Sequence, residues 1–549
     1  MSSPFPASDS DPQESAKPEA DEASEGRHPV VPPAWIWLVP CALVVVSVMV
    51  QYVSLTGDNA VTNIVTLVCL LIAVLIPGIW FVFFSGFPRW VRTGTAVAAI
   101  GAPILAFVLF PIDHVSGELI PSFRFRWSRA PDPLPVPLAT SEDADRRDLA
   151  DPSPFDFPQF LGPQRNARVE GVELSRDWEA RPPHLVWRQA IGAGWSAFAA
   201  ARGLAVTLEQ RGAEELVSCY ELDTGNLRWA HATHARHETF LGGAGPRGTP
   251  TIDGDRVFAL GAVGDLHCLE LQTGRLIWHE NLLERYGLRP ENDTQALAWG
   301  RSGSPLVVDD LVVVPAGGPA GGPYVSLAAF DRGTGQFQWE AGQTQIGYAS
   351  PILTTLADVR QIVSVNESNV TGHDPATGVV LWEASWPGSS TANANCSQPV
   401  PVGQQQLLVS KGYTWGAALL QIDLHGQKLA PRQVWHNRTL LKTKFTNLVV
   451  HSGHAYGLSD GTLECVNIAA GERRWKRGRY GQGQILGVGA LLLVLSEDGE
   501  LALVEASPEA YRELGRFPAL EGKTWNNLCL VEHKLLIRNA AEAACYELP

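Results

Sequence analysis

The apolar and polar residues of the C-terminal two thirds of the chain follow one repeated pattern. An apolar strand leads into a polar turn that contains Gly, and a second strand closes on Trp, as in CYELDTGNLRW and CLELQTGRLIW. Such units recur every 40 to 61 residues, a spacing typical of the four-stranded blades of a β-propeller. We expect the closing residue to lie between blades, because it recurs in nearly every unit. The closing residues are Trp187, Trp229, Trp278, Trp339, Trp382, Trp435, Trp475 and Phe517, and eight units predict eight blades.

The two ends of this repeat are incomplete in complementary ways. The unit HLVW at Trp187 lacks its first strand, whereas ACYELP at the C-terminus repeats the CYEL of residues 219–222 and then stops. We expect the strands within residues 183–192 and 543–548 to pair and to complete one blade. A ring closed in this way leaves no free strand edge.

A different pattern occupies the N-terminal 111 residues. Residues 1–33 carry seven acids against Lys17 and Arg27, which predicts a disordered acidic tail. Apolar blocks follow at about residues 35–53, 61–84 and 93–110, each near the ~20 residues that cross a bilayer as a helix. They predict three transmembrane helices in a membrane region of residues 34–111. Residues 112–155 are rich in Pro and charge and predict an extended linker.

The orientation of these spans follows from their number. With the N-terminus in the cytoplasm, three spans place the propeller in the periplasm or at the exterior. The arginines that flank the spans are nearly balanced between the two sides, so they add little to this argument. We therefore expect a multi-pass protein of the inner (cytoplasmic) membrane.

Composition agrees with an all-β fold, an eight-bladed propeller over residues 156–549, preceded by the membrane helices. The chain has 52 Gly, 39 Pro and 18 Trp, a density of turn and aromatic residues that suits many short strands. The net charge of −15 and the absence of a basic run argue against a nucleic-acid partner, because phosphate binding needs a basic surface.

Several motifs carry a resemblance to a known family. In order, FPQFLGPQRN, HLVW, repeated DTGxLxW units, LSEDGELALVEASPE and GKTW resemble bacterial proteins with pyrroloquinoline-quinone-like (PQQ-like) propeller repeats. The resemblance covers about residues 156–549 and implies the propeller fold. The same repeat builds quinoprotein alcohol dehydrogenases, the non-enzymatic outer-membrane assembly protein BamB and many other exported propellers. The aromatic residues of the first motif, FPQFLGPQRN, also suggest that residues 156–166 pack on the propeller as a cap.

For the enzymes of this family, the resemblance implies a calcium-bound PQQ at the ring centre, an adjacent pair of cysteines, a stacking Trp, and acidic and amide calcium ligands. This sequence has neither a Cys-Cys pair nor a CxxCH motif for haem attachment. Cys219, Cys268, Cys465 and Cys545 occupy equivalent positions in different units, whereas Cys41 and Cys69 lie in the predicted membrane helices and Cys396 and Cys529 are scattered. We expect free buried thiols. The spacing of His231, His234 and His237 matches no recognised zinc pattern. No cofactor, metal ligand or catalytic residue is therefore predicted; PQQ with calcium belongs to the dehydrogenase alternative.

Binding is expected where the insertions gather, on the face of the ring that surrounds its central channel. Polar and aromatic residues just before the inner strands, together with one inserted loop, should form the channel mouth and suit a small polar ligand or a peptide. These candidate ligand-binding residues are Trp195, Arg247, Arg301, Asn395, Tyr413, Trp415, Lys444, Trp525 and Asn526.

Three functions remain open at this point. The first is a membrane-anchored binding or scaffolding module for proteins or peptides of the cell envelope, which is not an enzyme. The second is a PQQ-dependent dehydrogenase, and the third is a propeller that binds carbohydrate or another small ligand. An enzyme should place an acid and an amide in calcium-coordinating geometry, whereas a scaffold needs only an apolar or aromatic groove on the rim.

Overall fold

The computed structural model describes residues 30–53, 58–127, 134–136 and 149–549. Most of the expected acidic tail and much of the expected linker lie outside the described residues. The chain forms two compact units, one of residues 1–48 and 67–108 and the other of residues 49–66 and 109–549.

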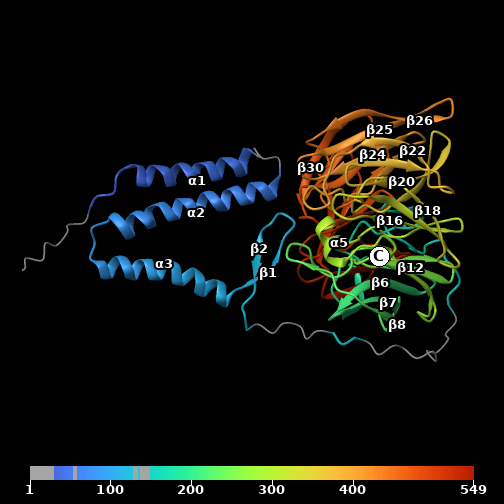
Figure 1. Cartoon of the computed structure of the whole chain (residues 1–549), viewed down its shortest axis with the longest axis horizontal. Coiled ribbons are helices and arrows are strands. Elements are labelled where there is room, and N and C mark those ends of the chain that lie inside the picture. The colour runs from blue at the N-terminus through green and yellow to red at the C-terminus, as the bar shows by residue number, and fades with distance from the viewer. Residues whose placement is uncertain (1–29, 54–57, 128–133, 137–148) are drawn as a thin grey trace, which may run out of the picture. The chain divides into compact units, whose positions relative to one another are not determined.

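Three long apolar helices precede the sheets: α1 (Trp35–Val53), α2 (Asn59–Phe84) and α3 (Arg89–Leu109) (Figure 1). Each is long and apolar enough to cross a bilayer, which confirms the three candidate spans. α3 begins four residues earlier than expected, and Arg92 in its first turn donates from Nη1 to the carbonyls of Val82 and Phe83 at the end of α2. A cation is favourable at that helix end.

Eight sheets in the described part of the chain each contain four antiparallel strands, and in seven of them these four strands are consecutive in the sequence, as the green-to-red colours in Figure 1 show. They confirm the eight-bladed propeller. Blade 1 contains β5 (Ala199–Ala201), β6 (Leu204–Arg211), β7 (Glu214–Glu221) and β8 (Leu227–His234); blade 2 contains β11 (Thr251–Asp253), β12 (Arg256–Leu260), β13 (Asp265–Glu270) and β14 (Leu276–Asn281); blade 3 contains β15 (Leu306–Val308), β16 (Leu311–Gly317), β17 (Val325–Asp331) and β18 (Phe337–Ala341); blade 4 contains β19 (Ile352–Leu356), β20 (Val359–Val365), β21 (Asn369–His373) and β22 (Val380–Ser385).

The remaining blades continue the same inner-to-outer order. Blade 5 contains β23 (Val400–Val402), β24 (Gln406–Lys411), β25 (Gly416–His425) and β26 (Lys428–Asn437); blade 6 contains β27 (Val449–His451), β28 (His454–Ser459), β29 (Thr462–Asn467) and β30 (Glu472–Arg479); blade 7 contains β31 (Gln484–Val488), β32 (Leu491–Leu495), β33 (Glu500–Glu505) and β34 (Glu513–Pro518); blade 8 contains β35 (Cys529–Val531), β36 (Lys534–Arg538), β37 (Glu542–Glu547) and β4 (His184–Ala190). Four smaller elements lie in the loops between blades: β9 (Glu238–Thr239), which pairs with β10 (Gly243–Ala244), and the short helices α4 (Leu282–Arg285) and α5 (Pro290–Ala296).

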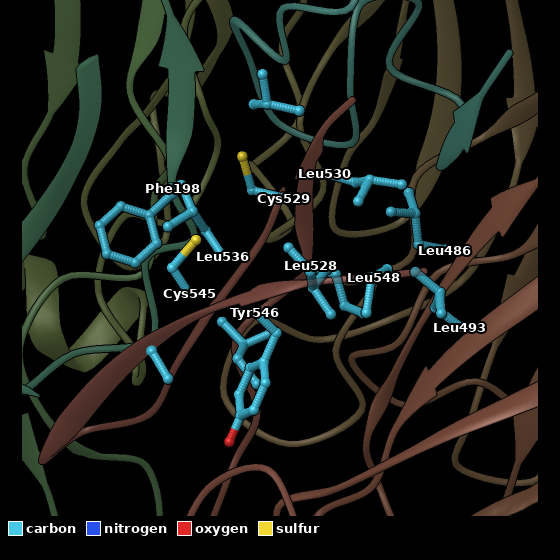
Figure 2. Close-up of a cluster of buried hydrophobic side chains, with 14 of the residues drawn as sticks. Phe198, Leu486, Leu493, Leu528, Cys529, Leu530, Leu536, Cys545, Tyr546 and Leu548 are labelled. Atoms are coloured by element: carbon cyan, nitrogen blue, oxygen red, sulfur yellow. The ribbon is translucent and has the colours of Figure 1, made fainter. Parts of the chain in front are cut away.

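Blade 8 joins the two ends of the propeller. Its third strand β37 pairs antiparallel with β4, with Cys545 opposite Trp187. The inner strand β5 lies beside both β11 and β35, so blade 1 meets blades 2 and 8. Figure 2 shows the resulting core, in which blade-8 side chains such as Leu528 and Tyr546 lie between Phe198 of blade 1 and Leu493 of blade 7. All eight cysteines lie in described segments and are free thiols, but only five are buried: Cys69 and Cys396 are partly buried and Cys41 is exposed.

The repeated phrase has a specific structural cause, which blades 1 and 2 illustrate. The Nε1 atom of Trp229 in blade 1 donates to the carbonyl of Leu271 in blade 2, at 2.8 Å. The turn of blade 2 lies over the same indole, because a Cβ on Gly274 would be 2.5 Å from Trp229 Cε3. A side chain at this turn would therefore collide with the Trp of the preceding blade. Equivalent Gly–Trp pairs are Gly225 with Trp187, Gly335 with Trp278, Gly378 with Trp339 and Gly471 with Trp435.

The start of the expected linker is folded. Strands β1 (Ile112–Val115) and β2 (Pro121–Phe123) form an antiparallel hairpin, where an extended spacer was expected. The composition of residues 112–155 as a whole concealed a short segment with alternating apolar residues and a Gly turn.

Residues 157–169 lie across the ring. Phe157 pairs with Ala200 of blade 1, and the guanidinium of Arg165 donates to the carbonyls of Ser304 and Pro305 beside blade 3. On the other side, β3 (Arg168–Val169) runs parallel to β31 of blade 7. Gln398, before blade 5, also donates to the carbonyl of Arg165, so the segment contacts blades on opposite sides of the ring and crosses its axis. Burial lowers the pKa of Arg165 to about 9.

Candidate functional site

Two tryptophans from opposite ends of the propeller sequence meet at its centre. The ring centroids of Trp195, before blade 1, and Trp525, before blade 8, are 4.9 Å apart. Phe445, before blade 6, lies 4.7 Å from Trp525. The Nζ atom of Lys523 lies 4.0 Å from the centroid of Trp525 and 5.0 Å from that of Trp195, a cation–π arrangement. We call the surface formed by Trp195, Arg247, Phe445, Lys523 and Trp525 the mouth.

Arg247 joins the mouth through a shared backbone carbonyl. Its Nη2 atom donates to the carbonyl of Gly242 at 3.0 Å, and Trp195 Nε1 donates to the same oxygen at 2.5 Å. Burial lowers the pKa of Arg247 to about 10 and that of Lys523 to about 8, the latter opposed by the nearby Glu497. Both groups stay cationic at neutral pH, so the mouth has cationic side chains in an acidic protein.

The carboxylate of Glu497 connects the mouth to the β1–β2 hairpin. It accepts hydrogen bonds from Trp525 Nε1 at 2.8 Å, from the backbone N–H of Gln482 at 3.0 Å and from that of Gly117 at 2.6 Å. Gly117 lies in the hairpin tip, which we define as residues 115–118. A Cβ at Gly117 would be 2.4 Å from Gln482 Cγ, so the tip is tightly enclosed.

Cations of the propeller surround the hairpin tip. Lys523 donates to the carbonyl of Val115 at 3.4 Å, and Arg479 forms an ion pair with Glu118. Lys444 donates to the carbonyl of Gly117 at 3.4 Å. The tip therefore presents acceptors and a carboxylate to a basic surface.

Lys444 also binds a residue that precedes α2. Its Nζ atom lies 3.1 Å from Asp58 Oδ1 and 5.7 Å from the ring centroid of Tyr413, and both members of the ion pair are buried. The N-terminal end of α2 adds Asn59 and Asn63, whose Nδ2 atoms donate to Glu118. The residues at the start of α2 and the hairpin tip that follows α3 therefore contact the same part of the propeller.

Two of the residues expected at the mouth serve the inserted loops instead. Arg301 is buried against Asp293 of α5, with 2.7 Å between Nη2 and Oδ1, and desolvation lowers its pKa. The Nδ2 atom of Asn395 donates to three backbone carbonyls, those of Asn366, Glu367 and Trp386. These bonds fix loop conformations and explain why position before an inner strand is not enough to place a side chain at the mouth.

Trp415 belongs to a separate aromatic cluster on blade 5. Its ring centroid lies 5.2 Å from His436 and 6.3 Å from Trp386. Lys411 Nζ is 5.8 Å from the Trp415 ring, and burial lowers the pKa of this lysine to about 8. The inserted loop thus forms a second cationic and aromatic cluster, distinct from the mouth.

Asn526 holds blades 8 and 1 together. Its Nδ2 atom donates to the carbonyls of Gly194 and Ser196, at 3.2 and 2.7 Å. Its buried Oδ1 atom accepts no hydrogen bond from the described residues.

Sequence reasoning missed Phe445, Lys523, Glu497 and the hairpin tip. Lys523 lies two residues before Trp525 in the GKTW motif, and Glu497 lies in LSEDGE, so a motif-based choice could have included both. The hairpin tip had no comparable signal, because its partners in the propeller lie more than 300 residues away in sequence.

The residues at the mouth do not fit a calcium-bound PQQ. Trp195 and Trp525 are in contact with each other, so no planar cofactor can stack between them, and the sequence has no adjacent pair of cysteines to form the other wall of such a site. The nearby carboxylate of Glu497 is already held by three N–H donors. Within the described residues, no group of three or more His, Cys, Asp or Glu side chains is arranged to hold a metal ion.

The ring closed by β37 and β4, the Trp–Gly contacts between blades and the segment across the axis together define a PQQ-like β-propeller. The chain belongs to the family described as outer membrane protein assembly factor BamB, whose model matches residues 184–477. None of the curated proteins gives a match.

Several solved structures are similar to this chain. BamB from Moraxella catarrhalis is 17% identical, with a TM-score of 0.49, over 67% of this chain and 100% of that one. A europium-containing methanol dehydrogenase is 11% identical, with a TM-score of 0.55, over 72% and 98% of the two chains. A quinohemoprotein alcohol dehydrogenase from Comamonas testosteroni is 12% identical, with a TM-score of 0.52, over 71% and 80%. The likeness to the two dehydrogenases is one of fold.

Proposed function

We propose that the chain is a membrane-anchored propeller that works outside the cytoplasm as a non-catalytic binding or scaffolding module for proteins of the cell envelope. The observation that carries this proposal is the hairpin tip held at the mouth. The propeller binds a polypeptide turn there through Glu497, Lys444 and Arg479, and most of these contacts are to backbone atoms. A surface that recognises backbone accepts polypeptide of varied sequence.

Exposed aromatic surface beside the mouth supports the same proposal. The β9–β10 hairpin carries Phe240 and Leu241, of which Phe240 is 76% exposed. Its Gly242 carbonyl is the acceptor shared by Trp195 and Arg247. Exposed apolar side chains next to charged ones are typical of protein interaction sites. The membership of a family described as an assembly factor agrees with this role.

A titration separates this function from the dehydrogenase alternative. The full chain, purified in detergent, is titrated with PQQ and Ca²⁺ while heat and quinone absorbance are recorded. The proposal predicts no saturable binding at millimolar ligand, because the two indoles are in contact. Saturable binding with a shifted quinone absorbance would contradict the proposal and would direct attention to alcohol and sugar substrates.

The proposed location is the inner membrane, with the propeller in the periplasm or at the exterior. Three candidate spans after a cytoplasmic N-terminus support it. Protease added to intact spheroplasts should then digest the propeller epitopes and spare an epitope at the N-terminus. The reverse protection pattern would overturn this orientation.

A further inference from the structure

Aromatic and basic side chains alternate directly after the β1–β2 hairpin. The alternating residues are Phe123, Arg124, Phe125, Arg126 and Trp127. Their side chains are exposed, Trp127 to 67% and Phe123 to 58%. The ring of Phe125 lies 5.4 Å from Phe110 and 5.3 Å from Trp127. Phe110, Phe125 and Trp127 therefore form one exposed aromatic cluster next to the two arginines.

Backbone hydrogen bonds tie this segment to the end of a candidate membrane span. The N–H of Arg126 donates to the carbonyl of Leu109, the last residue of α3, at 2.7 Å. The N–H of Arg124 donates to the carbonyl of Pro111 at 3.1 Å. If α3 crosses a bilayer, the residues hydrogen-bonded to its end must lie at the depth of the headgroups. Aromatic rings are enriched at that depth.

The charge of the segment indicates what it contacts there. Arg124 is paired with Asp113 at 3.0 Å, and the carboxylate of Asp113 also contacts His114 at 3.1 Å. Residues 123–127 contain two arginines and no acid, so the segment keeps a net positive charge even when Asp113 is counted with it. Arginine binds phosphate oxygens in a bidentate manner, and basic residues beside a span are attracted to anionic lipid.

We propose that residues 123–127 form an interfacial anchor in which Arg124 and Arg126 bind the phosphates of anionic phospholipids and the three aromatic rings enter the headgroup layer. This inference rests on the membrane anchoring in the proposed function. The segment adjoins the hairpin tip, so lipid contact would occur within a few residues of the contacts at the mouth.

Native mass spectrometry of the detergent-solubilised full chain tests the anchor. Phosphatidylglycerol or phosphatidylcholine is titrated into wild type, the Arg124→Gln/Arg126→Gln variant and a control, Arg474→Gln/Arg477→Gln, which removes two exposed arginines from β30. Wild type and control should bind phosphatidylglycerol in preference to phosphatidylcholine. The first variant should bind phosphatidylglycerol about tenfold more weakly, since each basic residue near a membrane surface contributes to the attraction.

Equal phosphatidylglycerol binding by wild type and the Arg124/Arg126 variant would overturn the inference, as would an equal loss in the control. Alkaline extraction of membranes provides the separate test of anchoring. All variants should stay in the membrane pellet, because the three helices are unchanged. Release of the wild-type chain into the supernatant would instead contradict the membrane-anchored part of the proposed function.

Discussion

Trp229 and Trp339 occupy equivalent positions on the outer strands of blades 1 and 3, but their indole N–H groups differ. Trp229 donates to the carbonyl of Leu271, whereas the buried Nε1 atom of Trp339 finds no acceptor among the described residues. The sequence predicts both as packing residues between blades, since both end the same repeated phrase. It does not distinguish them, because the hydrogen bond depends on the backbone of the next blade.

This difference predicts unequal effects of the same substitution. Trp229→Phe removes packing volume and also leaves the buried carbonyl of Leu271 without a partner, whereas Trp339→Phe removes volume alone. Trp229→Phe should therefore lower the free energy of unfolding by about 1 to 2 kcal/mol more than Trp339→Phe. Unfolding in guanidinium, followed by the circular dichroism signal of the β-sheets, measures this difference in the free energy of unfolding. Equal losses would show that the indole hydrogen bond does not stabilise the ring.

A second residue-scale prediction concerns pH. His237 is buried beside Arg247, and burial together with that cation lowers its pKa to about 4. Between pH 6.5 and 4 the unfolded chain takes up a proton on this imidazole that the folded chain does not. The free energy of unfolding should therefore fall as pH falls, and this histidine should contribute about 2 kcal/mol of the loss by pH 5.

The variant His237→Gln carries no titrating group at this position. Its unfolding midpoint should change less between pH 7 and pH 5 than that of wild type. An identical pH dependence in the two proteins would mean that His237 is not the residue whose protonation destabilises the fold.

At the scale of elements, the turns of blades 2 and 5 differ both in their sequence and in their contact with the Trp of the preceding blade. Blade 2 keeps the TG turn and covers the preceding Trp229, whereas the turn of blade 5 has diverged. Its Gly426 has no atom within 4 Å of an added Cβ, and the preceding Trp382 binds Gln361 of its own blade instead.

Gly274→Ala and Gly426→Ala therefore form a matched pair. Both glycines have φ in the left-handed region, at +72° and +66°, so each alanine costs about 1 kcal/mol for backbone strain. Gly274→Ala should cost a further 1 to 3 kcal/mol, about the penalty of overpacking, because its Cβ would meet Trp229. Thermal unfolding compares the two. A Gly426→Ala chain as unstable as Gly274→Ala would refute the inter-blade contact as the cause of the repeat.

Among the elements, the blades and the three helices could be predicted from the sequence, but the β1–β2 hairpin could not. Strands and turns of the blades follow from local patterns, and the three helices follow from apolar length. The β1–β2 hairpin does not, because its stability comes from Glu497, Arg479 and other residues far along the chain. The start of α2 at Asn59 depends on a local cap, since Asp58 Oδ1 accepts the N–H of Ala60, and this could have been predicted.

For the whole molecule, the number of blades could be predicted because each unit ends on the same kind of residue. The candidate site was predicted only in part. Trp195, Trp525, Arg247 and Lys444 lie at or beside the mouth, whereas Arg301 and Asn395 hold loops. The sequence shows that a residue lies just before an inner strand. Whether its side chain faces the mouth depends on how its loop folds against the next blade, which the sequence does not show.

The central claim is that the mouth is a surface for polypeptide from another envelope protein. A photoreactive benzoylphenylalanine in place of Phe240, 76% exposed beside the mouth, tests it in growing cells. The control places it at Val379, 60% exposed in the outer turn of blade 4. Irradiation should give a discrete crosslinked species that contains an envelope protein from position 240 and none from position 379. The same products from both positions, or none from position 240, would contradict the claim.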